Sequence, residues 1–173
     1  MESILEILKY ILPALIVFAT VYFMMKRYID MQYSREVLHY KQKQMDKLMP
    51  IKLQAYERLA MFCERISIDT LSYRLSSGST EAKHLSNAMM IAIQQEYEHN
   101  LSQQVYVSSK LWEIITIVKN QMQEIISDAS KDPSIGTSPA ALVAKAYEIQ
   151  NSMGGSPLAK AKRAIKEEVD IIL

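Results

Sequence analysis

The sequence of 173 residues contains little cysteine, glycine or proline: one cysteine, four glycines and five prolines. A single cysteine excludes an intramolecular disulfide and is compatible with a reducing compartment. Scarce glycine and proline, with 49% apolar residues, argue against a β-sandwich, a barrel or a disordered chain and favour helices. The formal net charge is only +1, so the basic surface typical of a nucleic-acid-binding protein is not expected.

Sequence motifs for catalysis and nucleotide binding are absent as well. The chain has no Walker loop, no dinucleotide-binding glycine pattern, no Cys/His metal ladder and no nucleophile-elbow serine. We therefore expect no catalytic residues and no cofactor, and we identify no small-molecule substrate. The expected partners are the lipid bilayer and a protein partner or a second copy of the chain, and not nucleic acid.

What the sequence does contain is one long apolar run near its start. From Ile11 to Met25 no residue is charged. Extended to residues 4–25, the run spans roughly 33 Å as a helix, enough to cross a bilayer core. Residues 1–3 would lie outside. A cleaved signal peptide fits poorly, because the run is neither preceded by a basic region nor followed by a small-x-small site. A buried core helix is the alternative.

Charge predicts the orientation of this transmembrane helix. Basic residues follow the apolar run and are sparse before it; those that follow are Lys26, Arg27, Arg35, Lys41, Lys43 and Lys47. Positive charge on the cytoplasmic side then places the N-terminus outside and the rest of the chain in the cytoplasm. Residues 26–49 lack glycine and proline and are predicted to form a membrane-proximal helical stalk. It is either solvated or bound to anionic headgroups, and a short coiled coil is a further alternative.

A helical bundle is predicted over residues 50–129. Pro50 is expected to break or kink the preceding helix. The helix that follows carries apolar residues over about half of its circumference, which requires neighbours on more than one flank. We therefore place Ile51–Ile66 at the centre of the bundle. The apolar residues are Leu53, Ala55, Tyr56, Leu59, Ala60, Phe62, Cys63 and Ile66. Cys63 is interpreted as a small core residue.

The second half of this region is predicted to be two helices. A single helix from Thr80 to Ala129 would be about 75 Å long, too long for a compact domain of this size. We expect a break at Asn100–Ser102, because Asn and Ser side chains compete for backbone hydrogen bonds. A polar cluster lies here, before Trp112, and forms either a set of buried amides or a ligand or peptide site. Its members are Asn100, Gln103, Gln104 and Tyr106.

Residues 130–137 are predicted to be a linker and residues 138–173 a helical tail. Ser138-Pro139 and Ser156-Pro157 each combine an N-cap serine with a proline at the first helical position. The last helix carries one apolar stripe, which is assigned to partner docking. Packing on its own domain or on the membrane stays open. The stripe is Leu158, Ala161, Ile165, Val169 and Ile172.

Two Glu-x-x-His pairs are the one hint of metal chemistry. They are Glu36–His39 and Glu96–His99. Di-iron carboxylate bundles use two such pairs with two further glutamates, since residues three apart share a helix face. Against this, Glu36–His39 lies in the charged stalk. Glu96 is alternatively partnered by an arginine, with Arg58, Arg65 and Arg74 as candidates, or by the neighbouring His99.

Several of these motifs together resemble a family of uncharacterised bacterial proteins with one N-terminal membrane span and a helical cytoplasmic region. The resemblance rests on the Gln-Ala-Tyr-Glu-Arg-Leu run at 54–59, Glu-His-Asn at 98–100, Gln103-Gln104, Tyr106 and Trp112. It implies no activity, but it implies the bacterial inner membrane as the location. It also implies a structural polar core formed by Gln54, Tyr56, Glu57, Arg58, Glu96, Asn100, Gln103, Gln104, Tyr106 and Trp112.

The sequence therefore predicts an all-α protein with a single transmembrane helix, a helical stalk, a cytoplasmic bundle and a helical tail. Its predicted function is that of a membrane-anchored adaptor or scaffold that acts through protein–protein contacts. The alternative function is a metal-binding, di-iron-like bundle.

Overall fold

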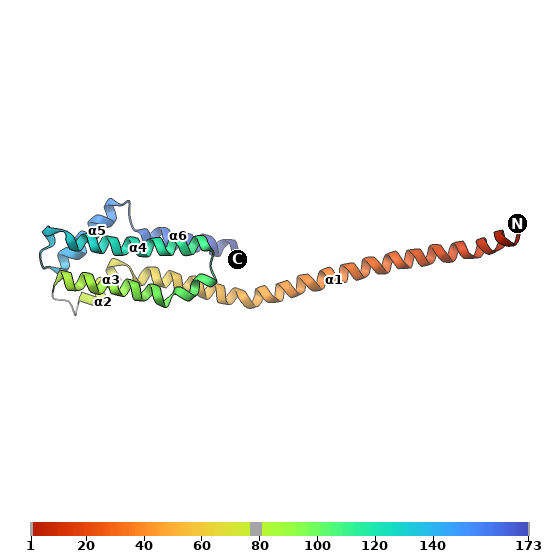
Figure 1. Cartoon of the computed structure of the whole chain (residues 1–173), viewed down its shortest axis with the longest axis horizontal. Helices are drawn as coiled ribbons and strands as arrows, with labels where there is room; N and C mark the ends of the chain where they lie inside the picture. The colour runs from red at the N-terminus through yellow and green to blue at the C-terminus, as the bar shows by residue number, and fades with distance from the viewer. Residues whose placement is uncertain (1, 77–80, 173) are drawn as a thin grey trace. The chain divides into compact units, whose positions relative to one another are not determined.

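The computed structural model describes residues 2–76 and 81–172, and this part of the chain is all-α. It contains six α-helices and two 3₁₀ turns and confirms the predicted fold class (Figure 1). The elements are α1 (Glu2–Arg65), α2 (Ile68–Leu75), α3 (Ala82–His99), η2 (Leu101–Val105), α4 (Ser109–Lys131), η3 (Pro133–Ile135), α5 (Pro139–Ser152) and α6 (Pro157–Ile172). The chain divides into two compact units, residues 1–49 and 50–173.

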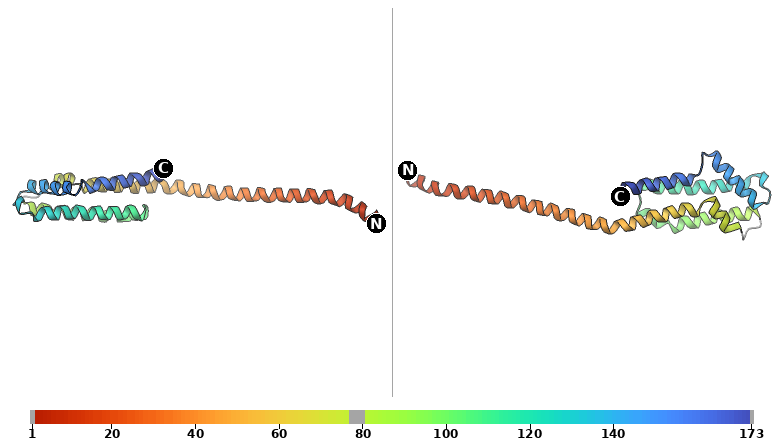
Figure 2. Two further views of the ribbon diagram at one scale, coloured as in Figure 1. Left: turned by 90° about the horizontal axis from the view of Figure 1, so that it is seen from above. Right: turned by 180° about the vertical axis from the view of Figure 1, so that it is seen from behind.

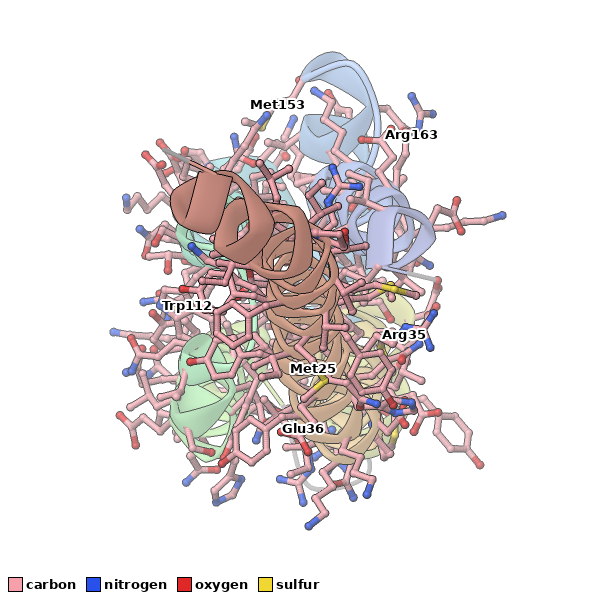
Figure 3. All side chains as sticks on the ribbon, turned by 90° about the vertical axis from the view of Figure 1, so that its right-hand side faces the viewer. Met25, Arg35, Glu36, Trp112, Met153 and Arg163 are labelled. Carbon is pink, nitrogen blue, oxygen red and sulfur yellow. The ribbon has the colours of Figure 1, made fainter. Side chains whose placement is uncertain are left out.

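The first unit contains a helix with exposed apolar side chains. Along Ile11–Met25 the exposed fraction is about half or more for most large apolar residues, and it reaches 70% at Phe18 and 73% at Met24. Helix α1 is long and apolar enough here to cross a membrane, as a membrane anchor or a signal sequence. Beyond this run the surface becomes mixed, and the side chains of Arg35 and Glu36 project outward from α1 (Figure 3).

Pro50 does not end α1, which continues to Arg65. Of the two predicted effects of Pro50, a break or a kink, the break is therefore wrong. A proline inside a helix removes one backbone hydrogen bond, here to the carbonyl of Asp46, and costs about 3 kcal/mol. That cost is local and leaves the turns on both sides helical.

The second unit is a helical bundle with one apolar core. Within it, α4 packs against α3, α5 and α6, and these helices run side by side in all three views (Figures 1 and 2). The last part of α1 contributes the predicted apolar face. Its buried side chains are Ala55, Tyr56, Leu59, Phe62, Cys63 and Ile66. The prediction of this face is confirmed.

Serine caps explain where several of these helices begin. The Ser67, Ser108 and Ser138 hydroxyls accept hydrogen bonds from backbone N–H groups in the first turns of α2, α4 and α5. Each such cap stabilises its helix by about 1 kcal/mol. Helices α5 and α6 start at Pro139 and Pro157, as predicted, and α3 ends at His99, beside the predicted break.

Helices α5 and α6 belong to the core of the bundle. Leu142 and Ala146 of α5 and Ala161 and Ile165 of α6 are buried in the same apolar cluster as α1, α3 and α4. The region predicted as a helical tail therefore packs on the bundle. The connection between these helices turns at Gly154 and Gly155, with φ of +85° and +101°, a conformation that favours glycine.

Candidate functional site

A carboxylate of α3 joins three helices at one side of the bundle. Glu96 is only 7% exposed, and its Oε1 accepts a hydrogen bond of 2.8 Å from Arg65 Nε at the end of α1. Arg74 Nη1 of α2 lies 3.4 Å from the same oxygen. The buried carboxylate is therefore neutralised by arginines, which was the alternative to metal binding that the sequence left open.

A pocket of about 340 Å³ opens beside this ion pair. Asn100 is one of its lining residues, and its side-chain Nδ2 donates to the Glu96 carbonyl at 2.7 Å and so caps the end of α3. The pocket is lined by Arg58, Met61, Phe62, Arg65, Glu96, His99 and Asn100. Its two arginines and one carboxylate favour an ion-pair network.

A second carboxylate, Glu168 of α6, ties together α1 and the start of α4. Its Oε1 accepts hydrogen bonds from the Tyr56 hydroxyl at 2.9 Å and from the Ser108 backbone N–H at 2.8 Å. Its Oε2 accepts from the Ser108 hydroxyl at 2.5 Å. Burial of Tyr56, together with this hydrogen bond and the charge of Glu168, raises the pKa of the Tyr56 hydroxyl to about 12.

An aromatic stack lies between α3 and α4. The rings of Tyr97 and Trp112 are stacked, with centroids 5.5 Å apart. The ring centroid of Phe62 in α1 lies 6.3 Å from that of Tyr97. Lys119 Nζ lies 5.2 Å from the Tyr97 centroid, in cation–π distance. Trp112 thus packs against an aromatic partner that the sequence analysis did not identify.

The predicted polar core is only partly a core. Tyr56, Glu96 and Gln103 are buried, and Asn100 and Trp112 are half-buried. The other predicted members are exposed, namely Gln54, Glu57, Arg58, Gln104 and Tyr106. Gln54, Glu57 and Arg58 lie on the charged side of α1, and η2 turns Gln104 and Tyr106 outward. These five residues are therefore not part of a buried polar core.

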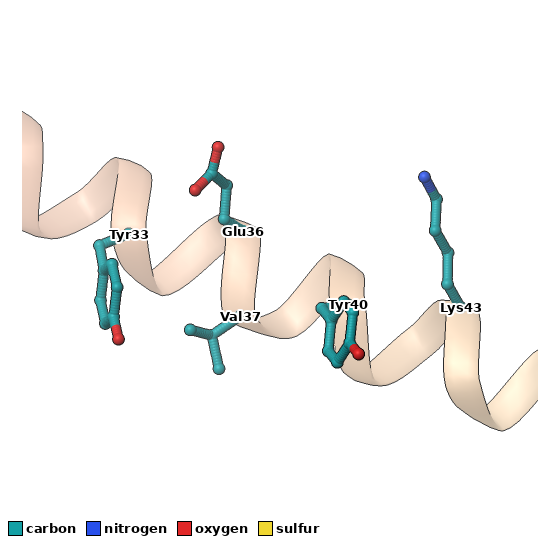
Figure 4. A pocket seen from close by; sticks show the side chains of 5 residues that line it. All are labelled: Tyr33, Glu36, Val37, Tyr40 and Lys43. Atoms are coloured by element: carbon teal, nitrogen blue, oxygen red, sulfur yellow. The ribbon is translucent and has the colours of Figure 1, made fainter.

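The Glu-x-x-His pairs lie in different units, one at Glu36–His39 and one at Glu96–His99. Both Glu36 and His39 are exposed. Figure 4 shows Glu36 and Lys43 on one side of α1, with Tyr33, Val37 and Tyr40 on the other. Within residues 2–76 and 81–172, no three His, Cys, Asp or Glu side chains form a group that could hold a metal ion.

The apolar stripe of α6 faces its own bundle. Leu158, Ala161 and Ile165 are at most 5% exposed, and Val169 and Ile172 pack against the same core. The structure therefore does not support the assignment of these five residues to partner docking. The alternative was that α6 packs on its own domain. The structure agrees with this alternative, because the stripe contacts α4 and the apolar core.

Cys63 is a core residue, as the sequence indicated. It is 1% exposed, and burial raises the pKa of its thiol to about 12, with the nearby Lys162 partly opposing the effect. The thiolate is the reactive form of cysteine, so this environment disfavours reactivity.

Sequence reasoning missed three residues that organise the bundle. Glu168 and Ser108 form the carboxylate cluster described above, and Asp69 accepts a hydrogen bond from the Tyr147 hydroxyl of α5. Each of these pairs joins positions at least 60 residues apart. The serine before α4 was detectable as an N-cap signal, but its long-range partner was not.

Comparisons with known proteins give one match. A sequence model described as "Family of unknown function (DUF7935)" matches residues 2–172. No curated protein and no solved structure matches the chain.

Proposed function

The chain belongs to the DUF7935 family, whose function is unknown, and we propose that it is a membrane-anchored adaptor that acts through protein–protein contacts without catalysis. The single observation that carries this proposal is the pairing of an exposed apolar helical run with a separately cored bundle in one chain. Tethering raises the local concentration of the bundle for other membrane-bound partners.

The apolar run of α1 supports the anchor. No residue of its most apolar window is buried within the protein. Leaving this much apolar surface in water is costly, at roughly 25 cal/mol per Å², and a bilayer removes that cost. The alternative of a buried core helix therefore loses its support.

The basic residues after the run support the proposed orientation. Lys26, Arg27 and Arg35 follow the run, and the positive-inside rule then favours a bundle on the cytoplasmic side. We extend the proposal to a single-pass protein of a bacterial inner membrane. That location also fits the reduced, buried state of Cys63.

The surface around η2 and the end of α6 is the best candidate for the partner. Both elements lie at the same end of the second unit (Figures 1 and 2). Val105 and Ile171 are 76% and 84% exposed, and Tyr106 lies beside Val105. Ile171 also lines a groove of about 330 Å³ between α4 and α6, together with Ser108. Apolar residues rimmed by polar ones are typical of protein contacts.

Position-specific crosslinking in intact membranes tests the proposal. A photo-reactive amino acid is placed at position 105 or 171, with position 120 of α4 as an exposed control. We expect one specific protein, or a second copy of the chain, to be captured at 105 and 171 and not at 120. Ile171→Asp should abolish capture from position 105, and Val105→Asp should abolish capture from position 171, while the bundle stays folded. Capture of the same set of proteins from all three positions would contradict the proposal.

No observation among the described residues favours the metal-binding alternative. Its carboxylate at Glu96 is already paired with Arg65 and Arg74. Elemental analysis of the purified full-length protein tests it independently. Stoichiometric iron, manganese or zinc would revive it.

A further inference from the structure

A polar pocket lies between the first turns of α3, the last turn of α4 and the segment after η3. Its volume is about 490 Å³, within the range of small-molecule sites. It lies apart from the η2–α6 surface. The pocket is lined by Glu81, Ala82, Lys83, Ser86, Asn87, Ser130, Lys131, Ile135, Gly136 and Thr137.

One side chain of this pocket has an unmet hydrogen-bonding need. Ser86 is 1% exposed, and within the described part of the chain its Oγ is the one buried side-chain oxygen or nitrogen with no hydrogen-bond partner. An unpaired buried hydroxyl costs about 1–3 kcal/mol. Because Ser86 lines the pocket, a ligand oxygen that displaces the atoms covering its Oγ would accept this hydrogen bond.

The charges around Ser86 favour an anion. Lys83 and Lys131 carry two positive charges against the single carboxylate of Glu81. The start of α3 adds the positive end of an 18-residue helix, equivalent to about half a charge. Glu81 occupies the N-cap position but makes no side-chain cap hydrogen bond. Its carboxylate lies toward His84, with 3.8 Å between Glu81 Oε2 and His84 Nε2.

Two further contacts shape the pocket without filling it. The Ala82 N–H donates to the Thr137 carbonyl at 2.9 Å, which holds the segment after η3 against the start of α3. The Lys131 ammonium pairs with Asp128 at 3.2 Å, but both side chains are more than half exposed. Such surface pairs contribute little, so Lys131 can turn toward a ligand at small cost.

We propose that this pocket binds the phosphate group of a small ligand. The Ser86 hydroxyl donates to a phosphate oxygen, and the Lys83 and Lys131 ammonium groups neutralise its charge at the positive end of α3. The volume beyond the phosphate accommodates the rest of the ligand. Helix starts with nearby basic side chains are suited to this chemistry.

Ligand-dependent thermal unfolding of the full chain tests this site. The protein is held in nanodiscs of neutral phosphatidylcholine, and its melting temperature is followed as inorganic phosphate is added. Sodium chloride of equal ionic strength and sodium acetate serve as controls. We expect phosphate to raise the melting temperature in a saturable way and both controls to leave it unchanged.

Matched variants assign the effect to the pocket. Lys83→Gln combined with Lys131→Gln should weaken phosphate binding by about tenfold or more. Lys166→Gln, at an exposed position of α6, should leave phosphate binding unchanged. Ser86→Ala should weaken phosphate binding and yet leave the phosphate-free protein as stable or more stable, because it removes the unpaired hydroxyl. A purely structural serine would give the opposite sign, with lower stability in the absence of phosphate.

A second experiment, in nanodiscs that contain anionic phospholipid, identifies the source of the phosphate group. If only nanodiscs with anionic phospholipid protect the wild-type protein, and the lysine variants abolish that protection, the phosphate belongs to a lipid headgroup. The proposal is wrong if phosphate shifts the wild type and the double lysine variant equally. It is also wrong if no phosphate source produces a shift, or if acetate acts as phosphate does.

Discussion

At the scale of single residues, the bundle depends on carboxylates that reach across helices. Glu96 is held by Arg65 and Arg74, and Glu168 by Tyr56 and Ser108. The arginines are 49% and 38% exposed at their side chains, so water screens part of the first interaction. Each cluster therefore contributes modest stability but fixes how α1 sits on its neighbours.

Replacing the first carboxylate should have a measurable cost. Glu96→Gln keeps the shape of the side chain but removes its charge, so the ion pairs with Arg65 and Arg74 become hydrogen bonds from a charged donor to a neutral acceptor. We expect a loss of about 1 kcal/mol in the free energy of unfolding. Urea titration followed by the fluorescence of Trp112, the single tryptophan, measures it. Glu98→Gln, at an exposed position on the same helix, is the control. Equal losses in the two variants would contradict the assigned role of Glu96.

The pKa of Tyr56 makes stability depend on pH above neutrality. The pKa rises from 10.0 to about 12 in the folded protein, mainly because the hydroxyl is buried and bonded to Glu168. The folded state thus holds this proton more tightly than the unfolded chain. The resulting stabilisation is complete below pH 10 and is lost as the pH rises toward 12.

Tyr56→Phe should therefore flatten this dependence, since phenylalanine does not titrate. Urea midpoints between pH 9 and 12 should fall less steeply for Tyr56→Phe than for the wild type. Tyr73→Phe, at a side chain that is 87% exposed, should follow the wild-type curve. Parallel curves for wild type and Tyr56→Phe would show that the hydroxyl is not buried against Glu168.

At the scale of elements, α6 gives the sharpest contrast between the two uses of an apolar side chain. Ile165 is 5% exposed in the core, and Ile171 is 84% exposed on the next turns of the same helix. Ile165→Ala should destabilise the bundle by about 2–4 kcal/mol through lost burial and a cavity. Ile171→Ala should change stability by less than about 0.5 kcal/mol. Urea titration measures both, and similar values for the two would mean that α6 does not pack as described.

The elements also show where local patterns suffice and where they do not. The Ser-Pro pairs correctly predicted where α5 and α6 begin, and Asn100–Ser102 predicted the end of α3. These signals are local, because a helix cap or break depends on only a few neighbouring residues. The stripe of α6 was equally visible in the sequence, but the surface that it packs against is formed by other helices, such as α4. An amphipathic pattern predicts that the apolar face of a helix is buried, but it does not identify the surface that buries it.

The candidate sites follow the same division. The partner of Glu96 was among those that the sequence proposed, since a carboxylate on an apolar face requires a counter-charge. The role of Glu168 could not be predicted from the sequence, because Glu168 is one of several charged residues of α6. Its role depends on the hydrogen bonds with Ser108, which form only in the folded bundle. The pocket at Ser86 was equally hidden, since it needs α3, α4 and the segment after η3 to be assembled.

At the scale of the whole molecule, the chain combines an apolar helical run with a bundle that has its own core. The composition near Ile11–Met25 and the burial pattern after Pro50 are independent properties of the chain. Together they favour a tethered module, in which the first part fixes location and the second carries contacts. Topology is the property on which this account depends most.

Paired reporters fused after Leu173 measure that topology directly. A fluorescent protein reports a cytoplasmic end, and alkaline phosphatase is active only outside the cytoplasm. Both are assayed on membranes washed at alkaline pH, with Val17→Lys, Val21→Lys as the control that disrupts the apolar run at a cost of several kcal/mol. We predict that the fusion is fluorescent, phosphatase-inactive and retained in the membrane, and that the fusion with the two lysine substitutions is washed off. An active phosphatase, or a wild-type fusion washed into the soluble fraction, would contradict it.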